Sequence, residues 1–206
     1  NLQHIPMIFA VICLLLSALY MTTLQLKIVL RTEKNSATLR SESVYREFAE
    51  KKLGSSIFNR SKLTFDSKKF EQEMVSEFPE LSAVSVAIPL ISHKPIVDLY
   101  AEKPALLMGS EKGVFVLNKN GIAIVKANSD QPVEGLNIPL IRDEANIPIE
   151  LGKGALTSQD VAFITTIVSQ FENKKIPIES LTLPPLASEL RVKVTGQKYY
   201  IKFNLL

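Results

Sequence analysis

"FPELSAVSVAIPLISHKPIVDLYAEKP", residues 78–104, contains two runs in which apolar and polar residues alternate, separated by a segment with a proline at each end. In the first run, Val84, Val86 and Ile88 fall on one face, and residues 96–102 alternate in the same way. Alternation with a period of two predicts strands, and prolines at strand ends cost no ladder hydrogen bond. We therefore predict two adjacent strands joined by the intervening loop.

Two helices are predicted before these strands. The first covers residues 42–53, with Ser41 or Ser43 as its N-cap. The second follows Asp66, which is its predicted cap, and has an apolar side chain every fourth residue, which is typical of a helix packed on a core. The predicted order up to Pro104 is a strand within 26–40, a helix at 42–53, a helix at 67–78, and strands at 83–88 and 96–102.

A second unit is predicted after "LLMGSEKG", residues 106–113. Residues 113–125 have the pattern of a hairpin, and Asn120-Gly121 predicts a tight type I′ turn with two positive φ angles. A linker rich in Pro and Asn follows at 127–154. Thr157 and Asp160 form a capping-box pattern for a helix at 158–171. Three more strands are predicted at 178–183, 189–195 and 198–206.

The N-terminal part of the chain has no charged residue from Ile5 to Leu26. At ~1.5 Å per residue such a helix reaches ~33 Å, enough for a hydrocarbon core of ~30 Å, so it predicts an uncleaved membrane anchor. A cleaved signal peptide is the alternative, but the apolar run is longer than usual and no clear A-x-A site follows. Residues chosen to mark the span are Ile5, Phe9, Leu14, Leu16, Leu19 and Leu26.

Composition disfavours several other classes. The chain has 206 residues, 46% of them hydrophobic, and a net charge of +3 with basic and acidic residues interspersed, which gives no support to nucleic-acid binding. Its single cysteine, Cys13, rules out a disulfide framework. The basic residues Lys27, Arg31, Lys34 and Arg40 follow the span, and by the positive-inside rule alone they would keep the rest of the chain in the cytoplasm.

Residue patterns for catalysis are weak. The chain has two histidines, neither with a neighbour at metal-ligand spacing, and His93 is interpreted as a solvated loop residue. Asp143-Glu144 lies in the predicted linker and is interpreted as solvated charge. No serine stands in G-x-S-x-G or S-x-x-K. We therefore predict no catalytic residues, no cofactor, no metal and no small-molecule substrate.

A strand edge offers function without catalysis, because its unpaired N–H and C=O groups can add a partner's strand. "KYYIKFNLL", residues 198–206, is the predicted edge, with polar side chains opposite its apolar ones. The alternative is an ordinary strand whose edge is covered by residues beyond Leu206. The predicted partner-binding residues are Lys198, Tyr199, Tyr200, Ile201, Lys202 and Phe203.

The order strand, helix, helix, strand, strand directly after a single span resembles the POTRA domain of FtsQ/DivIB-type bacterial cell-division proteins. "IFNRSKLTFD", "FPELSAVSVAIP" and "KPIVDLYAEKPALL" are similar to the family's motifs in that domain, and "VFVLNKNGIAI" to the hairpin that opens its β domain. Lys103 and Asn118 stand where the family usually has Arg and Asp. In that family a further helix and strand follow the strand resembling "KYYIKFNLL", so we expect a shortened chain or a different partner surface here.

The resemblance implies an α+β chain with a transmembrane anchor at 1–26, a POTRA-like domain (β-α-α-β-β) at 27–106 and a mixed β domain with one packed helix at 107–206. It implies a non-enzymatic divisome scaffold in septum formation, single-pass in the cell membrane, with its C-terminal domains outside the cytoplasm. The implied partners are FtsB/FtsL (DivIC-like) proteins and the septal cell-wall synthase complex. The alternatives are a membrane-anchored envelope enzyme whose catalytic residues lie elsewhere, and a POTRA-bearing component of protein translocation or assembly.

Overall fold

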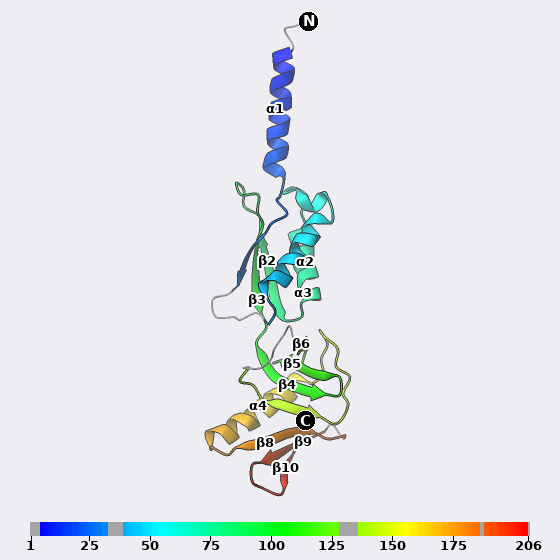
Figure 1. The fold of residues 1–206 in the computed structure, drawn as a ribbon, viewed down its shortest axis with the longest axis vertical. Coiled ribbons are helices and arrows are strands. Elements are labelled where there is room, and N and C mark those ends of the chain that lie inside the picture. The colour runs from blue at the N-terminus through cyan, green and yellow to red at the C-terminus, as the bar shows by residue number, and fades with distance from the viewer. Residues whose placement is uncertain (1–4, 33–38, 128–135, 186–187, 206) are drawn as a thin grey trace. The chain divides into compact units, whose positions relative to one another are not determined.

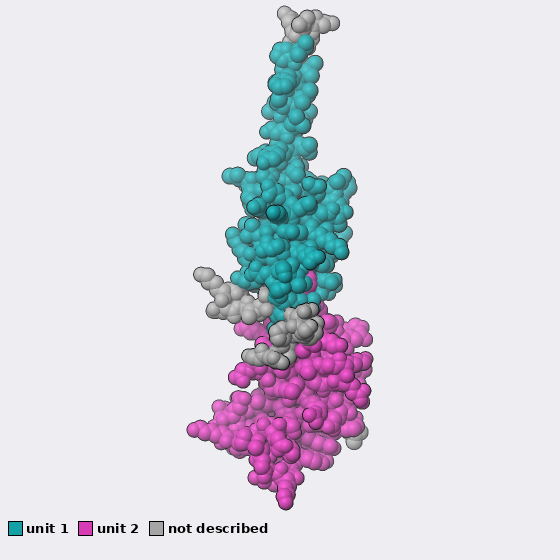
Figure 2. All heavy atoms as spheres, in the orientation of Figure 1, with its two compact units in different colours: residues 1–77, 83–100 teal, residues 78–82, 101–206 magenta. Residues whose placement is uncertain are grey.

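A computed structural model describes residues 5–32, 39–127, 136–185 and 188–205. Within them the chain is mixed α+β, with four α-helices and ten strands in two sheets (Figure 1). It divides into two compact units, one of residues 1–77 and 83–100, the other of residues 78–82 and 101–206 (Figure 2). Lys34 of the predicted basic flank and residues 128–135 of the predicted linker lie outside the described residues.

The N-terminal helix α1 (Ile5–Thr22) is long and apolar enough to cross a membrane, and none of its side chains is buried. The predicted span extended four residues too far, because Leu26 lies beyond the helix. The helix ends where Thr22 and Thr23 turn their hydroxyls back to the Leu19 carbonyl, at 3.0 and 2.8 Å. Beyond this point Leu24 is 1% exposed and belongs to the core of the folded unit.

The first unit has the predicted order of strand, helix, helix, strand, strand. Its three strands form one sheet in the order β1-β3-β2, in which β1 pairs with β3 in parallel, so the last strand lies between the other two. Figure 1 shows the two helices beside this sheet. The elements are β1 (Val29–Thr32), α2 (Glu42–Gly54), the 3₁₀ turn η2 (Phe58–Arg60), α3 (Ser67–Glu77), β2 (Leu81–Ala87) and β3 (Ile96–Ala101).

The helices of this unit start and pack largely as their sequences predict. Asp66 caps α3, since its Oδ1 accepts the Lys69 N–H at 3.0 Å. Ser41 stands at the N-cap of α2, but its hydroxyl contacts the Ser43 hydroxyl at 2.8 Å instead of a helix N–H. The buried side chains of the two helices are Tyr45, Ala49, Leu53, Phe70 and Met74, and the buried Phe78 follows directly after α3.

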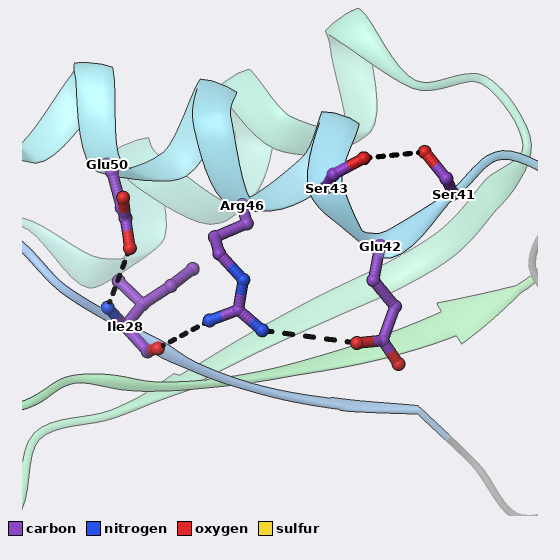
Figure 3. A network of polar contacts seen from close by, with 6 residues as sticks. All are labelled: Ile28, Ser41, Glu42, Ser43, Arg46 and Glu50. Atoms are coloured by element: carbon purple, nitrogen blue, oxygen red, sulfur yellow. Dashed lines mark hydrogen bonds and ion pairs between the residues drawn. The ribbon is translucent and has the colours of Figure 1, made fainter.

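A polar network holds the segment after α1 against α2 (Figure 3). Arg46 Nη1 donates to the Ile28 carbonyl at 3.0 Å, and the Ile28 N–H donates to Glu50 Oε1 at 3.4 Å. Arg46 Nη2 also lies 4.0 Å from Glu42 Oε2 one turn earlier. The backbone of Ile28 is thus held from both sides, which fixes the path of the chain between α1 and β1.

The second unit contains a seven-stranded sheet in the order β10-β9-β8-β7-β4-β5-β6. Two of its inner strands were not predicted. β4 starts at Pro104, which puts the division between the units near Ala101 instead of 106, and β7 lies inside the predicted linker. The strands are β4 (Pro104–Ser110), β5 (Gly113–Asn118), β6 (Ala123–Lys126), β7 (Leu140–Asp143), β8 (Ile178–Leu183), β9 (Glu189–Val194) and β10 (Tyr200–Asn204).

The turn between β5 and β6 differs from the predicted type I′ turn, because Gly121, with φ +76°, is the one residue of the turn with positive φ. The Gly121 N–H donates to the Asn118 carbonyl at 3.0 Å, and the buried Asn118 side chain accepts the N–H groups of Asn120 and Ile122. This is a type I turn followed by a left-handed residue. The Asn118 side chain thus bonds two backbone N–H groups of its own turn.

One helix, α4 (Ser158–Asn173), packs against the core of the second unit. Its predicted capping box is confirmed: the Asp160 N–H donates to Thr157 Oγ1 at 3.1 Å, and the Thr157 N–H donates to Asp160 Oδ2 at 3.2 Å. Within α4, Ile167 is buried, whereas Val168 is only partly buried. The helix contributes Val161, Ile164 and Ile167 to a core shared with strands β4 to β9.

Candidate partner-binding edge

Strand β10 is the last strand at one end of the seven-stranded sheet. It pairs antiparallel with β9, with Ile201 opposite Val192 and Phe203 opposite Leu190. Among the described residues, no strand lies on its other side. The backbone of β10 therefore presents an open edge of the kind that accepts an added strand.

The register shows which backbone groups of β10 point away from the sheet. The Leu205 N–H donates to the Ser188 carbonyl at 2.8 Å, which makes this pair hydrogen-bonded. Because hydrogen-bonded and non-bonded pairs alternate in an antiparallel ladder, Phe203 and Ile201 also bond to β9. The N–H and C=O groups of Tyr200 and Lys202, which alternate with these residues along the strand, are therefore directed outward.

The six predicted binding residues do not all belong to this strand. Lys198 and Tyr199 lie before it, in the bend that follows Gly196, because β10 begins at Tyr200. The prediction started the strand two residues too early, since Lys-Tyr-Tyr continues the alternation into the turn. Tyr199 is nevertheless 61% exposed, so it stays accessible beside the edge.

The side chains of β10 alternate between core and solvent as predicted. Ile201 and Phe203 are half-buried, and the Phe203 ring lies 6.3 Å from the Phe163 ring of α4 in an edge-to-face arrangement. The side chain of Phe203 therefore packs on the core instead of facing a partner. Tyr200 and Lys202 are exposed and share one face.

On that face, ion pairs connect side chains of the three strands β8, β9 and β10. Lys202 Nζ and Arg191 Nε lie 3.5 and 3.7 Å from Glu189 Oε2, and Lys193 Nζ donates to Glu179 at 2.6 Å. The Arg191 guanidinium also stacks over the Tyr200 ring, 5.1 Å from its centroid. With three cations and two carboxylates, this face suits a partner segment with a slight acidic excess.

An apolar groove of about 700 Å³ lies in the same unit, between the C-terminal end of α4 and strands β7 and β8. Val168, Ile176 and Ile178 line it together with Leu140. Arg142, Glu172 and Glu179 stand among its polar residues, and none of them pairs into a nucleophile–base arrangement. The groove has the largely apolar lining of a binding surface.

The polar residues considered for chemistry have structural roles. His93 was predicted to be a solvated loop residue, but it is engaged in two contacts. Its Nδ1 donates to the Thr23 carbonyl at 2.6 Å, and its ring packs on the Tyr20 ring with 4.6 Å between centroids. Asp143, interpreted as solvated charge, is 5% exposed, and its carboxylate accepts the N–H groups of Ala145 and Ile147, both at 2.9 Å. The described residues contain no group of three His, Cys, Asp or Glu side chains that could hold a metal ion.

Compared with models of known protein families, the chain matches none, and a search of curated proteins likewise finds no match. The likeness of its motifs to cell-division proteins therefore stands as a resemblance. The structural features that bear on function are the apolar helix α1, the two units and the open edge of β10.

Proposed function

We propose that this chain is a single-pass scaffold of the bacterial divisome, of the FtsQ/DivIB type, whose folded units lie outside the cytoplasm. It binds FtsB/FtsL-like division proteins and helps to position the septal cell-wall synthase complex. The observation that carries this proposal is the open edge of β10 in a unit that belongs to a chain with an apolar N-terminal helix.

The first unit supports the proposal through its connectivity. Its order of elements, with the sheet order β1-β3-β2 and the parallel pair β1 and β3, is compatible with a POTRA domain. The chain passes from Thr22 into this unit within two residues, since Leu24 is already buried. A domain held so closely to an anchor is suited to holding partners at the membrane surface.

The second unit supports it through strand addition. The outward N–H and C=O groups of Tyr200 and Lys202 can pair with an extended segment of a partner. Tyr200 and the neighbouring Tyr199 add large exposed rings, which are frequent anchors at interfaces. Backbone pairing supplies affinity, and the charged face beside it supplies selectivity.

The test replaces Lys202 by proline in the full chain. Proline removes the outward N–H without breaking a bond to β9, so the sheet is retained while one bond to the partner is lost. We expect a loss of about 1–2 kcal/mol of binding, or roughly 5- to 30-fold weaker capture of a co-expressed FtsB/FtsL-like complex in a pull-down.

The matched control is Lys202→Ala, which removes the same side chain and its ion pair with Glu189 but retains the N–H. Capture by this variant should stay within about threefold of the wild type, because exposed ion pairs contribute little. Equal capture by the proline and alanine variants would rule out strand addition through β10.

Depletion of the protein in its own cells separates a scaffold from an envelope enzyme. A divisome scaffold predicts filaments that grow and segregate DNA without completing septa. Normal division together with the loss of a soluble cell-wall product would instead favour the enzyme. A translocation component would be indicated by the accumulation of unassembled envelope proteins.

A further inference from the structure

Two loops of the first unit expose large apolar side chains at the place where the chain leaves α1. The first loop, residues 55–65, carries Ile57, Phe58 and Leu63, which are 77, 64 and 80% exposed. The second, residues 88–95 between β2 and β3, carries Leu90 and Ile91 at 89 and 85%. Side chains this exposed contribute nothing to the core, and five of them together call for an explanation.

Both loops are hydrogen-bonded to the end of the membrane helix. The Lys62 N–H donates to the Thr22 carbonyl at 2.7 Å, and the Leu24 N–H donates to the Arg60 carbonyl at 2.7 Å. On the other side, the Gln25 N–H donates to the His93 carbonyl at 2.7 Å. The loops are therefore fixed at the level where α1 ends.

A further contact joins the loops to each other, because Lys62 Nζ donates to the Leu90 carbonyl at 2.8 Å. The packing of the His93 ring on Tyr20 continues this attachment into the last turn of α1. The two loops thus form one surface around the helix end, here called the collar and defined by Ile57, Phe58, Leu63, Leu90 and Ile91.

The length of α1 sets the depth of the collar. Its 18 residues span ~27 Å at ~1.5 Å each, slightly less than a hydrocarbon core of ~30 Å. When the helix crosses the bilayer, Thr22 lies at the boundary between acyl chains and headgroups. Loops bonded directly to residues 22–25 must then lie within the headgroup layer.

The charges of the two loops match such a surface. Arg60, Lys62 and Lys94 are their cations, and neither residues 55–65 nor residues 88–97 include Asp or Glu. Apolar side chains flanked by cations are typical of segments that lie in the interface of anionic bilayers.

We propose that the collar is a membrane-docking surface: it inserts its five apolar side chains into the leaflet that α1 leaves, with its cations on anionic lipid headgroups. The occupant of the surface is the lipid itself, because the surface continues that of the anchor helix. Docking would hold the first unit against the bilayer instead of letting it pivot on α1. This docking proposal requires that α1 spans the membrane, as in the proposed function.

The test uses the absence of tryptophan from the chain, so that an introduced tryptophan is the single one present. Leu90→Trp, in the full chain reconstituted into vesicles of phosphatidylcholine and phosphatidylglycerol, should be quenched by lipids brominated near the headgroup end of their acyl chains. A depth of about 5–10 Å into the headgroup and acyl boundary predicts quenching at least about threefold that of a solvated site.

Val44→Trp is the matched solvated site in the same unit. Val44 lies on α2 and is 40% exposed. Gly54, at the C-terminal end of α2, lies beside Leu26. Val44 is ten residues before Gly54, so it lies ~15 Å along the helix from that end. Leu14→Trp, near the middle of α1, is the positive control and is read with lipids brominated near the methyl end of their acyl chains. In a Leu63→Trp chain, the added changes Leu90→Ser and Ile91→Ser should lower quenching at position 63, since both residues are solvent-exposed and their exchange spares the core.

The outcomes separate docking from anchoring. Quenching at position 14 with none at position 90 overturns docking and leaves the anchor intact. No quenching at position 14 overturns both. A blue-shifted but unquenched tryptophan at position 90, dependent on protein concentration, would show that protein covers the collar and would also overturn lipid docking.

Discussion

At the scale of single residues, Gly121 is the position where the turn chemistry is most demanding. Its φ is +76°, and a Cβ built there would lie 2.1 Å from the Leu156 carbonyl oxygen. The backbone cannot easily retreat, because the Ala155 N–H donates to the Gly121 carbonyl at 2.8 Å. Both the left-handed conformation and the close approach therefore require glycine.

We predict that Gly121→Ala lowers the free energy of unfolding by about 2–4 kcal/mol, since it combines conformational strain with a clash against backbone. Denaturant unfolding of the detergent-solubilised full chain, followed by circular dichroism, measures it. Gly196→Ala is the matched control: its φ is +79° but nothing lies within 4 Å, so it should cost only about 1 kcal/mol. Equal losses in the two variants would contradict the role of the Leu156 contact.

Residue patterns predicted some of these details and missed others. Asp66 and Thr157 were identified as caps because a cap bonds to a residue three positions away, which sequence shows directly. The role of His93 depends on backbone brought near by the fold, so no local pattern revealed it. Asp143 accepts the N–H groups of residues two and four positions later, so its role could have been noticed from the local sequence. Asn118 could have been noticed as a side chain able to bond its own turn.

At the scale of elements, the start of α4 is fixed by reciprocal bonds between Thr157 and Asp160. Thr157→Ala removes the acceptor for the Asp160 N–H and should cost about 1 kcal/mol of stability, whereas Thr157→Ser retains it and should cost less than about 0.5 kcal/mol. Hydrogen exchange of the first turn of α4 would report the loss locally. Unchanged exchange in the alanine variant would show that the cap does not hold this end.

The elements that sequence predicted are those with a long periodic pattern. The helices α2, α3 and α4 and the strands β3 and β8 come close to their expected bounds. β4 and β7 were missed: β7 has four residues next to Pro139, and β4 begins at Pro104 and is nearly continuously apolar. Inner strands of this kind are specified by their neighbours in the sheet, which no local pattern contains.

The candidate edge, too, was predictable from the sequence in some features and not in others. Alternation in residues 200–205 predicted the strand and its two faces, and the structure places it at the end of the sheet. The outward direction of the Tyr200 and Lys202 backbone could not be predicted, because it depends on the register with β9. The core contact of Phe203 with Phe163 depends likewise on the placement of α4.

At the scale of the whole molecule, the proposed function requires the folded units to lie outside the cytoplasm. A reporter enzyme that folds only outside the cytoplasm, fused after Leu206, should be active, and a fluorescent protein that folds only inside should stay dark. Long domains cross the membrane largely regardless of flanking charge, so Lys27 and Arg31 do not oppose this orientation. The opposite pair of results would support the positive-inside rule and contradict a divisome scaffold.

Photo-crosslinking in living cells tests the central claim most directly. With a photoreactive phenylalanine analogue in place of Lys202, whose backbone lies at the open edge of β10, irradiation should join the chain to an FtsB/FtsL-like protein. The same analogue at Lys119, exposed in the turn between β5 and β6 at the other end of the sheet, should give no such product. Crosslinks to that partner from position 202 alone are the predicted result, and equal crosslinking from both positions, or none from position 202, would contradict the account.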